Sequence, residues 1–424
     1  MRKTYSFKLL LTAEQRREID RWLDLLRAQY NYLLRERFDW WEYNRSYLVV
    51  PQGEYCLRWC ELGSGELKDN PDWHFQSASL PELKQQRPWY KEIYSQVLQD
   101  CVKRVKLAFK RFLAGDSSGK RSGKPRFKNR TRYRTLTYPT FPHKNLMGSR
   151  IKLPKLGILK FRKSRNIEPG FIPKTASITK KTDGYYLNLS VEDKSVPDLS
   201  LDTVPTEFNT VGVDVGLYKL YFDSNNNQAL PQRHLRKSES KLASLQRKLD
   251  DNARSKKAKK LVRQAISRLH QKVARQRKHW HYNEAHRLAK SCKVLAVEDL
   301  SMKNMKRKNK PKKIDGVFVA NGQAVSSGLN KSWSDNGVGN FLDILSQIAA
   351  KYGTRIIKVN PKGTSQHCSR CLNRVSKALS DRWHQCNSCE LSIDRDYNSS
   401  LLIKKLAVGS RQSKTLPSLK DLLS

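Results

Sequence analysis

The sequence predicts a multidomain protein of α+β and α/β class, with a β-rich first half interrupted by helices and a second half that carries a zinc-binding cysteine cluster. Three observations support this prediction. The length of 424 residues suits several folding units of roughly 100–200 residues each. Apolar residues recur every second position in some segments and at helical spacing in others. Four cysteines near the carboxyl end form two C-x-x-C pairs.

The amino-terminal part reads as one strand followed by helices. Residues 5–9 alternate apolar and polar side chains, and Thr12 with Gln15 fits a capping box that begins a long helix. A second helix is expected over residues 90–115, and the basic loop 115–135 is expected to contact phosphate groups.

Short strands follow from residue 151. Residues 151–161 and 183–193 alternate apolar and polar side chains around Gly157 and Gly184, which predicts a small antiparallel barrel or sheet. The first strand of the chain is expected to join it, so that the helices are an insertion into a β-domain. A linker is expected over residues 196–206.

The second half begins with a predicted hairpin, in which Val211, Val213 and Val215 form one strand and residues 217–222 the next. Residues 235–290 predict two antiparallel helices with 18 Lys and Arg against 4 Asp and Glu. We expect this charge to face phosphate groups. The remaining predicted elements are a strand, a basic loop, a helix, a strand and a peripheral tail, at residues 293–298, 306–313, 340–353, 354–361 and 414–424.

The charge balance indicates a polyanionic partner. The formal net charge is +44, and such an excess favours nucleic acid through neutralisation of phosphates and release of their counterions. No apolar run approaches the ~20 residues that span a bilayer, and the opening segment lacks the roughly 7–15 apolar residues of a secretory signal. We therefore expect a cytoplasmic protein, or a nuclear one in a eukaryote.

The clustered cysteines predict one structural zinc ion. Their C-x2-C-x14-C-x2-C spacing supplies four thiolates, which leaves no open position on a tetrahedral ion; they are Cys368, Cys371, Cys386 and Cys389. Disulfides are disfavoured without a secretion signal, and neighbouring His367 and His384 need no metal role. Without a secretion signal, the scattered cysteines are expected to be buried thiols; they are Cys56, Cys60, Cys101 and Cys292. Cys56 and Cys60 lie one helical turn apart, but they have no second pair, so zinc is not expected there.

Three acidic positions stand out in this basic half. Asp214 in "VGVDVG" and Glu298 in "LAVEDL" interrupt apolar strands, and Asp394 or Asp396 lies in "DRDYN". A carboxylate in such a strand costs desolvation unless it binds a cation or pairs with a base. Pairing with lysines is the structural alternative. If the acids converge, they suit two Mg²⁺ ions roughly 3.5–4 Å apart and hydrolysis of a phosphodiester.

These motifs resemble the TnpB family of transposon-encoded nucleases, to which type V CRISPR effectors are similar. "VGVDVG", "LAVEDLSMKNM", "TSQHCSRC", "CNSC" and "DRDYNSS" carry the resemblance over residues 206–405, and the start matches more weakly. The resemblance implies a β-barrel wedge domain with a helical recognition insertion, then an RNase H-like RuvC domain with an inserted, target-binding zinc ribbon. The corresponding residues are 1–11 with 125–200, 12–124, 206–364 with 394–424, and 365–393.

The resemblance also implies RNA-guided cleavage of double-stranded DNA beside a short adjacent motif. By motif position Asp214, Glu298 and Asp396 are the catalytic ligands of two Mg²⁺, and the cysteines hold one Zn²⁺. A transposon-derived guide RNA is expected, with one protein per guide, in the prokaryotic cytoplasm at the nucleoid. The family ends its last motif in Asp-x-Asn-Ala-Ala, whereas Ser399 and Ser400 replace the alanines here.

Within "DRDYN", Asp396 is the expected ligand because it starts a predicted helix, where the helix dipole favours an acid. Asp394 closes the zinc ribbon and is expected to tune or orient its neighbour. Three other functions remain open from the sequence. A compact type V CRISPR effector shares the domain plan, a non-catalytic zinc-containing nucleic-acid binder leaves the acids unexplained, and a DNA transposase lacks a separate motif.

Overall fold

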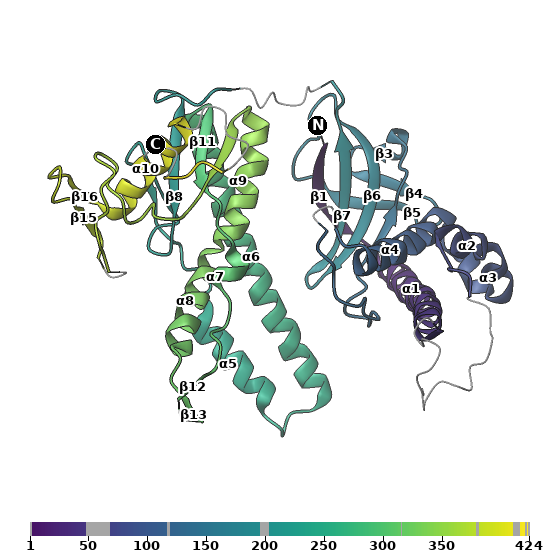
Figure 1. The fold of residues 1–424 in the computed structure, drawn as a ribbon. Helices are drawn as coiled ribbons and strands as arrows, with labels where there is room; N and C mark the ends of the chain where they lie inside the picture. Colours follow the sequence, from purple (N-terminus) through teal and green to yellow (C-terminus); the bar gives the residue numbers. More distant parts are fainter. Residues whose placement is uncertain are drawn as a thin grey trace. The chain divides into compact units, whose positions relative to one another are not determined.

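A computed structural model describes residues 2–47, 68–116, 119–195, 203–314, 316–378, 381–409, 416–419 and 422. The chain divides into two compact units, Met1–Asp198 and Leu199–Ser424 (Figure 1). Cys56 and Cys60 lie outside the described residues, as does most of the expected linker. Within the described ranges, no helix has the length and apolar character needed to cross a bilayer.

The first unit contains seven strands and a group of helices between the first two strands. In chain order its elements are β1 (Arg2–Leu10), α1 (Ala13–Tyr47), α2 (Trp73–Ala78), α3 (Leu80–Gln86), η1 (Pro88–Glu92), α4 (Ser95–Leu113), β2 (Thr135–Tyr138), η2 (His143–Asn145), β3 (Leu146–Met147), β4 (Arg150–Leu153), β5 (Gly157–Arg162), β6 (Ile172–Lys181) and β7 (Gly184–Glu192).

One antiparallel sheet joins all seven strands in the order β2-β6-β7-β1-β5-β4-β3. The first strand of the chain lies between β7 and β5, so the expected pairing of β1 with the later strands is confirmed. The strands follow one another from β2 at one end to β3 at the other, and no ladder between these two ends occurs in the described part of the chain.

The helices of this unit share a hydrophobic core with the sheet. The predicted capping box is present: Gln15 N–H donates to Thr12 Oγ1 (3.2 Å), and Thr12 N–H donates to Gln15 Oε1 (3.1 Å). The second long helix starts later than the sequence predicted. Ile93 is extended and divides η1 from α4, and this break buries both Tyr90 and Ile93 almost completely.

The second unit has a small sheet near its start and helix α10 near its carboxyl end. Its elements are β8 (Thr210–Val215), β9 (Tyr221–Asp223), β10 (Gln228–Ala229), η3 (Arg236–Ser238), α5 (Glu239–Asp250), α6 (Lys256–Ser291), β11 (Val294–Glu298), α7 (Met302–Met305), β12 (Lys312–Ile314), β13 (Val317–Val319), α8 (Gln323–Asn336), α9 (Val338–Tyr352), β14 (Arg355–Val359), β15 (Trp383–Gln385), β16 (Ser392–Asp394) and α10 (Arg395–Gly409).

The main sheet of this unit has the order β10-β9-β8-β11-β14. β10, β9 and β8 are antiparallel neighbours, whereas β8, β11 and β14 run parallel. β9 is shorter than predicted. The buried Asn336 side chain donates to the carbonyls of Gly216 (3.3 Å) and Leu217 (2.9 Å), which fixes residues 216–217 as a loop before β9.

Helices cover both faces of the second sheet. The core on one face contains α6 and α9 with the odd-numbered residues of β8 and β11, and α10 packs on the opposite face with Ala296 and Val359. α5 and α6 form the predicted antiparallel pair and pack against each other. In Figure 1 this pair extends away from the sheet, and α7 and α8 lie beside it.

Candidate active site and zinc site

Strand alternation places two of the three acids on one face of the sheet. Successive side chains of a strand point to opposite faces. Val211, Val213 and Val215 belong to the α6–α9 core, so Gly212 and Asp214 face α10. In β11, Leu295 and Val297 belong to that same core and Ala296 contacts α10, so Glu298 faces α10 as well.

The two acids are also neighbours along the sheet edge. β8 and β11 are parallel and pair Val213 with Val297, so the next residue of each strand is Asp214 and Glu298. Both lie at the carboxyl ends of their strands. The acids predicted from "VGVDVG" and "LAVEDL" therefore meet at one edge, on the face that α10 covers.

Gly212 lets α10 lie directly on β8. A Cβ atom at this position would lie 2.1 Å from the Ser400 carbonyl oxygen and 2.6 Å from the Lys404 nitrogen. Ser399 and Ser400 are fully buried there. Their hydroxyls donate to helix carbonyls of Arg395 (3.1 Å) and Tyr397 (2.7 Å), so serine fits this tight contact without an unpaired polar group.

Gly212→Ala should lower the melting temperature, because its new methyl group would clash with the backbone of α10. The same clash should displace α10 and the acids beside it, and so eliminate any reaction at this site. Gly216→Ala is the matched control, since its Cβ would have its nearest neighbour, the Lys219 carbonyl oxygen, at 3.4 Å. Thermal unfolding of both variants measures the difference. Equal melting temperatures for the two variants would contradict the close packing of α10 on β8.

The two aspartates of "DRDYN" have different surroundings. Asp394 Oδ1 accepts the backbone N–H groups of Asp396 (2.8 Å) and Tyr397 (3.2 Å), so it caps the amino end of α10. Its other oxygen, Oδ2, lies 2.8 Å from Lys219 Nζ. Asp396 lies in the first helical turn, and no ion pair is found for it among the described residues. Asp394 is therefore committed to the helix cap, while Asp396 is not.

Burial and the charges of neighbouring groups shift the pKa values of the three acids. Burial, then the negative charges of Glu298 and Asp396, raise the pKa of Asp214 well above its usual value. Burial also raises the pKa of Glu298, although the Thr364 hydroxyl opposes this effect. The pKa of Asp396 is raised by burial and then by Asp394. A nearby cation would favour the charged form of each of these three carboxylates.

Sequence reasoning missed two polar residues that support this site. The Thr364 hydroxyl lies 2.5 Å from Glu298 Oε1 and is buried with it. Asn336 fixes the loop after Asp214, and its own carbonyl lies 2.8 Å from His281 Nε2. Thr364 belongs to the quoted "TSQHC" motif, but nothing in the sequence pairs it with Glu298. In the sequence, Asn336 is a polar residue shortly before the predicted helix 340–353, and nothing else there distinguishes it.

The four clustered cysteines are close enough to bind one metal ion. Their sulfur atoms all lie within 4.8 Å of one another, the one such group of three or more ligands in the described ranges. The Cys368–Cys389 and Cys371–Cys386 sulfur pairs are each 3.5 Å apart. Zn–S bonds of about 2.3 Å in a tetrahedron place sulfurs about 3.8 Å apart, so this geometry fits zinc.

The two cysteine pairs repeat one local structure. The residue after each pair, Leu372 or Glu390, has a left-handed φ of 62° or 61°. Its N–H donates to the carbonyl of the first cysteine of the pair, at 3.0 or 2.9 Å. Burial alone would raise the pKa of Cys386, but the backbone N–H groups of Ser388 and Cys389, together with the thiols of Cys371 and Cys389, lower it to about 6. A thiolate is the form that binds zinc.

The three acids form a wider group than the cysteines. They lack a common set of oxygens within 4.8 Å, although their charges act on one another. Their carboxylate oxygens therefore do not converge on one point as the cysteine sulfurs do.

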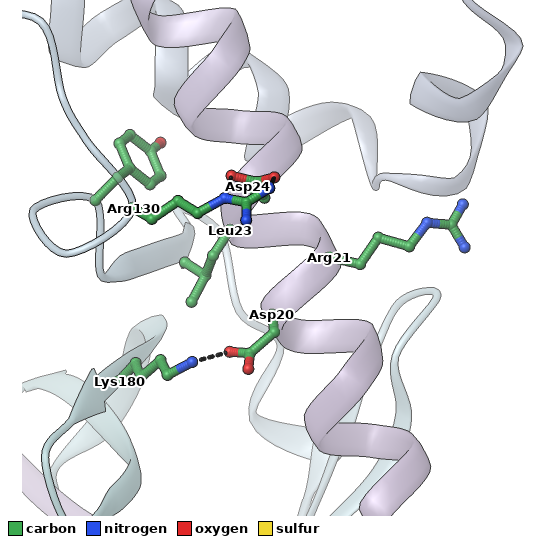
Figure 2. Close-up of a pocket in the computed structure, with 7 residues that line it drawn as sticks. Asp20, Arg21, Leu23, Asp24, Arg130 and Lys180 are labelled. Carbon is green, nitrogen blue, oxygen red and sulfur yellow. Dashed lines mark hydrogen bonds and ion pairs between the residues drawn. The ribbon is translucent and has the colours of Figure 1, made fainter. Parts of the chain in front are cut away.

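The first unit has a pocket of about 330 Å³ between α1, β6 and the loop before β2 (Figure 2). Its two acids are paired. Asp20 Oδ1 contacts Lys180 Nζ at 2.6 Å, and Asp24 accepts both Nε (3.1 Å) and Nη2 (2.8 Å) of Arg130. The Arg130 hydrogen bonds lower the pKa of Asp24. The ion pairs around this pocket connect α1 to β6 and to the loop before β2. Because both acids are paired with basic side chains, the pocket differs from the acidic site of the second unit.

Three family models match this chain. A model described as "Probable transposase" matches residues 188–309, and one described as "Cas12f1-like, TNB domain" matches residues 339–403. A third, described as "Helix-turn-helix domain", matches residues 1–46. In the structure that last segment is strand β1 followed by the single helix α1.

Curated relatives match along much of the chain. "Putative RNA-guided DNA endonuclease InsQ" from Escherichia coli (strain K12) is 29% identical over 327 residues, covering 76% of each chain. "Putative RNA-guided DNA endonuclease" from Streptomyces pristinaespiralis is 23% identical over 415 residues, covering 96% of this chain and 90% of the relative. "TnpB-like protein L79" from Acanthamoeba polyphaga mimivirus is 25% identical over 215 residues, covering 49% of this chain and 39% of the relative.

Two solved structures resemble the chain weakly. A cryo-EM structure of a Cas12f1–sgRNA–target DNA complex aligns with a TM-score of 0.33 and 16% identity, covering 95% of this chain and 99% of that one. The mini-RNA-guided endonuclease CRISPR-Cas_phi3 aligns with a TM-score of 0.36 and 11% identity, covering 88% and 66%. Both scores are below 0.5, and no assignment rests on them.

The second unit combines helices and sheets with two features. One is a cysteine cluster that can bind zinc, and the other is an acidic site formed by two strand residues and Asp396 of α10. The chain is similar to proteins of the TnpB family in its family-model matches and in its curated relatives, as the sequence motifs indicated.

Proposed function

We propose that this protein is an RNA-guided DNA endonuclease with a two-metal RuvC-type site. The observation that carries the proposal is the convergence of Asp214, Glu298 and Asp396 on one edge and one face of the second sheet. The curated relatives named as RNA-guided DNA endonucleases support it. The guide is a transposon-derived RNA, and the target is double-stranded DNA beside a short motif.

The strand order of the second sheet supports an RNase H-like domain. Three antiparallel strands followed by two parallel ones, in the order third-second-first-fourth-fifth, match the arrangement that this fold uses. We assign residues 206–364 and 394–424 to the nuclease domain and 365–393 to a target-binding zinc ribbon. Residues 1–11 with 125–200 form the wedge, and 12–124 form the recognition insertion.

In this site Asp214, Glu298 and Asp396 would hold two Mg²⁺. When bound, the ions activate a water and stabilise the leaving 3′ oxygen of the phosphodiester. The protein residues fix the geometry. Asp214 and Glu298 are held by adjacent parallel strands, and Asp394 holds the first turn of α10 by accepting two of its N–H groups.

The α5–α6 pair supplies a cationic surface for nucleic acid. Replacing Lys256, Lys257, Lys259 and Lys260 together by Gln should weaken binding of guide RNA or target. The salt dependence of binding, log K against log[salt], should become shallower by up to about 3–4. Replacement of the same four residues by Arg keeps the charge and is the control. An unchanged salt slope in the Gln variant would show that these lysines do not contact nucleic acid.

A cleavage assay with a changed guide tests the proposed function. The protein is purified with RNA from its own locus, and a DNA library with randomised flanks is supplied with Mg²⁺. Cutting should require both a matching target and a short flanking motif, and a new guide sequence should redirect it. If wild type and Asp214→Asn behave identically in Mg²⁺ with no cutting by either, the nuclease proposal fails.

A compact CRISPR effector is the second candidate, since the match to a Cas12f1-like domain favours it. The same assay detects either enzyme. The neighbouring DNA distinguishes them, because a CRISPR effector is encoded beside a repeat array and a transposon protein beside a transposon end.

A further inference from the structure

We propose that Asn398 is a positioning residue that couples the zinc ribbon to the metal-binding position of Asp396; this inference rests on the proposed function. Asn398 is fully buried. Its Oδ1 accepts the Ser369 N–H at 2.9 Å, and its Nδ2 donates to the His367 carbonyl at 2.8 Å. These two backbone groups lie on either side of Cys368, the first cysteine of the first knuckle. The Asn398 side chain therefore holds the backbone both before and after this cysteine.

Asn398 and Asp396 lie on opposite sides of the same helical turn. Residues two apart in an α-helix point about 200° from each other. While Asn398 points to the knuckle, the charge of Asp396 acts on Asp214 at the sheet edge. Any rotation of this turn away from the knuckle therefore moves Asp396 relative to Asp214.

The second half of the ribbon holds the same turn from its other end. β16 pairs with β15, with Asp394 opposite Trp383, and the Arg395 N–H donates to the Arg382 carbonyl at 2.9 Å. The first turn of α10 is thus fixed by the first knuckle through Asn398 and by the second knuckle through β15 and β16. A zinc ion held by the four cysteines would join the two knuckles, since each knuckle supplies two of them.

The ribbon therefore acts as a positioning frame for the nuclease site in addition to any contact with DNA. Loss of zinc, or loss of the Asn398 bonds, frees the helix turn that carries Asp396. The expected consequence is weaker binding of the catalytic cations, with little effect on the chemistry once they are bound. Mutation of residues that hold metal ligands in place typically lowers metal affinity by about 10–100-fold.

Asn398→Ala tests this in the guide-loaded protein. The metal concentration for half-maximal cleavage, measured with Mn²⁺, should rise about 10-fold or more. Saturating Mn²⁺ should restore the rate to within a few-fold of wild type, and zinc content should stay at one per chain. Asp396→Asn should not be rescued by Mn²⁺. An unchanged Mn²⁺ dependence, or a lost rate that no Mn²⁺ concentration restores, would overturn the proposal.

Asn209→Ala is the matched control. Its amide makes the same pair of backbone bonds, accepting from Thr206 N–H (2.8 Å) and donating to the Val204 carbonyl (2.9 Å). It precedes β8, at the end of the strand opposite to Asp214. This variant should keep the wild-type Mn²⁺ dependence. An equal shift in both variants would show a general loss of stability and overturn the specific role of Asn398.

Hydrogen exchange separates this inference from the proposed function. The amides of Asp396 and Tyr397 should exchange faster in Asn398→Ala and in zinc-depleted wild type, and at the wild-type rate in Asn209→Ala. Should Asn398→Ala fail to fold, Asn398→Asp keeps the acceptor for Ser369 and loses the donor to His367, and the same comparison applies. Unchanged exchange in the first turn of α10 overturns the coupling, whether or not the protein cuts DNA.

Discussion

Asp396→Asn should abolish DNA cleavage, by about 10³-fold or more, while guide RNA binding survives. The metal ions supply several kcal/mol of stabilisation to the charge of the transition state, and each 1.36 kcal/mol is about tenfold in rate. An asparagine of the same shape removes the negative charge that holds a cation and leaves the helix turn intact. Single-turnover cleavage with a matched target measures the loss.

Asp394→Asn is the paired variant for this prediction. An asparagine oxygen can still accept the N–H groups of Asp396 and Tyr397, so the helix cap remains. The ion pair with Lys219 is lost, and this half-buried pair has a modest value. We expect cleavage within about tenfold of wild type. If Asp394→Asn is inactive and Asp396→Asn cuts normally, the two aspartates have been assigned the wrong roles.

Asp214→Asn should eliminate cleavage and at the same time raise the melting temperature of the metal-free protein. Asp214 is held near Glu298 and Asp396, and burial and then their repulsion raise its pKa. A carboxyl whose pKa is raised by folding stabilises the fold at low pH and loses that contribution as the pH rises through the folded pKa. At pH 7 Asp214 must either stay charged among the other acids or take up a proton that the unfolded chain does not bind. Either way it destabilises the metal-free fold, and a neutral amide removes this penalty.

The pH dependence gives the sign of this effect. The difference in melting temperature, variant minus wild type, should be largest near pH 7 and should shrink as the pH falls toward the usual aspartate pKa near 4. A gain of about 2–4 °C is expected for each kcal/mol. Added Mg²⁺ should stabilise wild type and not the variant. A variant that is less stable than wild type at pH 7 without metal would contradict the crowding of these acids.

The sequence predicted those parts of the fold that depend on local patterns. The capping box at Thr12 and Gln15 formed as expected, because both partners lie within one helical turn. The strands around Asp214 and Glu298 also formed, because apolar runs bounded by turns are typical of buried parallel strands. The cysteine spacing was sufficient to predict a cluster, since the two knuckles are themselves local turns.

The remaining features depend on contacts between distant residues. The loop before β9 is set by Asn336, which follows it by more than a hundred positions. The assignment of Asp394 to the helix cap required atomic positions, since both aspartates lie near the helix start. The role of Asn398 required the fold as well, because its partners in the first knuckle are about thirty residues earlier.

In the proposed mechanism, three acids from separate parts of the chain form one nuclease site. Single-turnover cleavage by the guide-loaded protein tests it most directly, with wild type, Asp214→Asn, Glu298→Gln, Asp396→Asn and the Asp214→Asn/Asp396→Asn double variant compared in Mg²⁺. Because ligands that act as a unit are not additive, each single variant should fall to background and the double variant no further. Any one of the three acid variants that cuts at the wild-type rate would contradict a shared site.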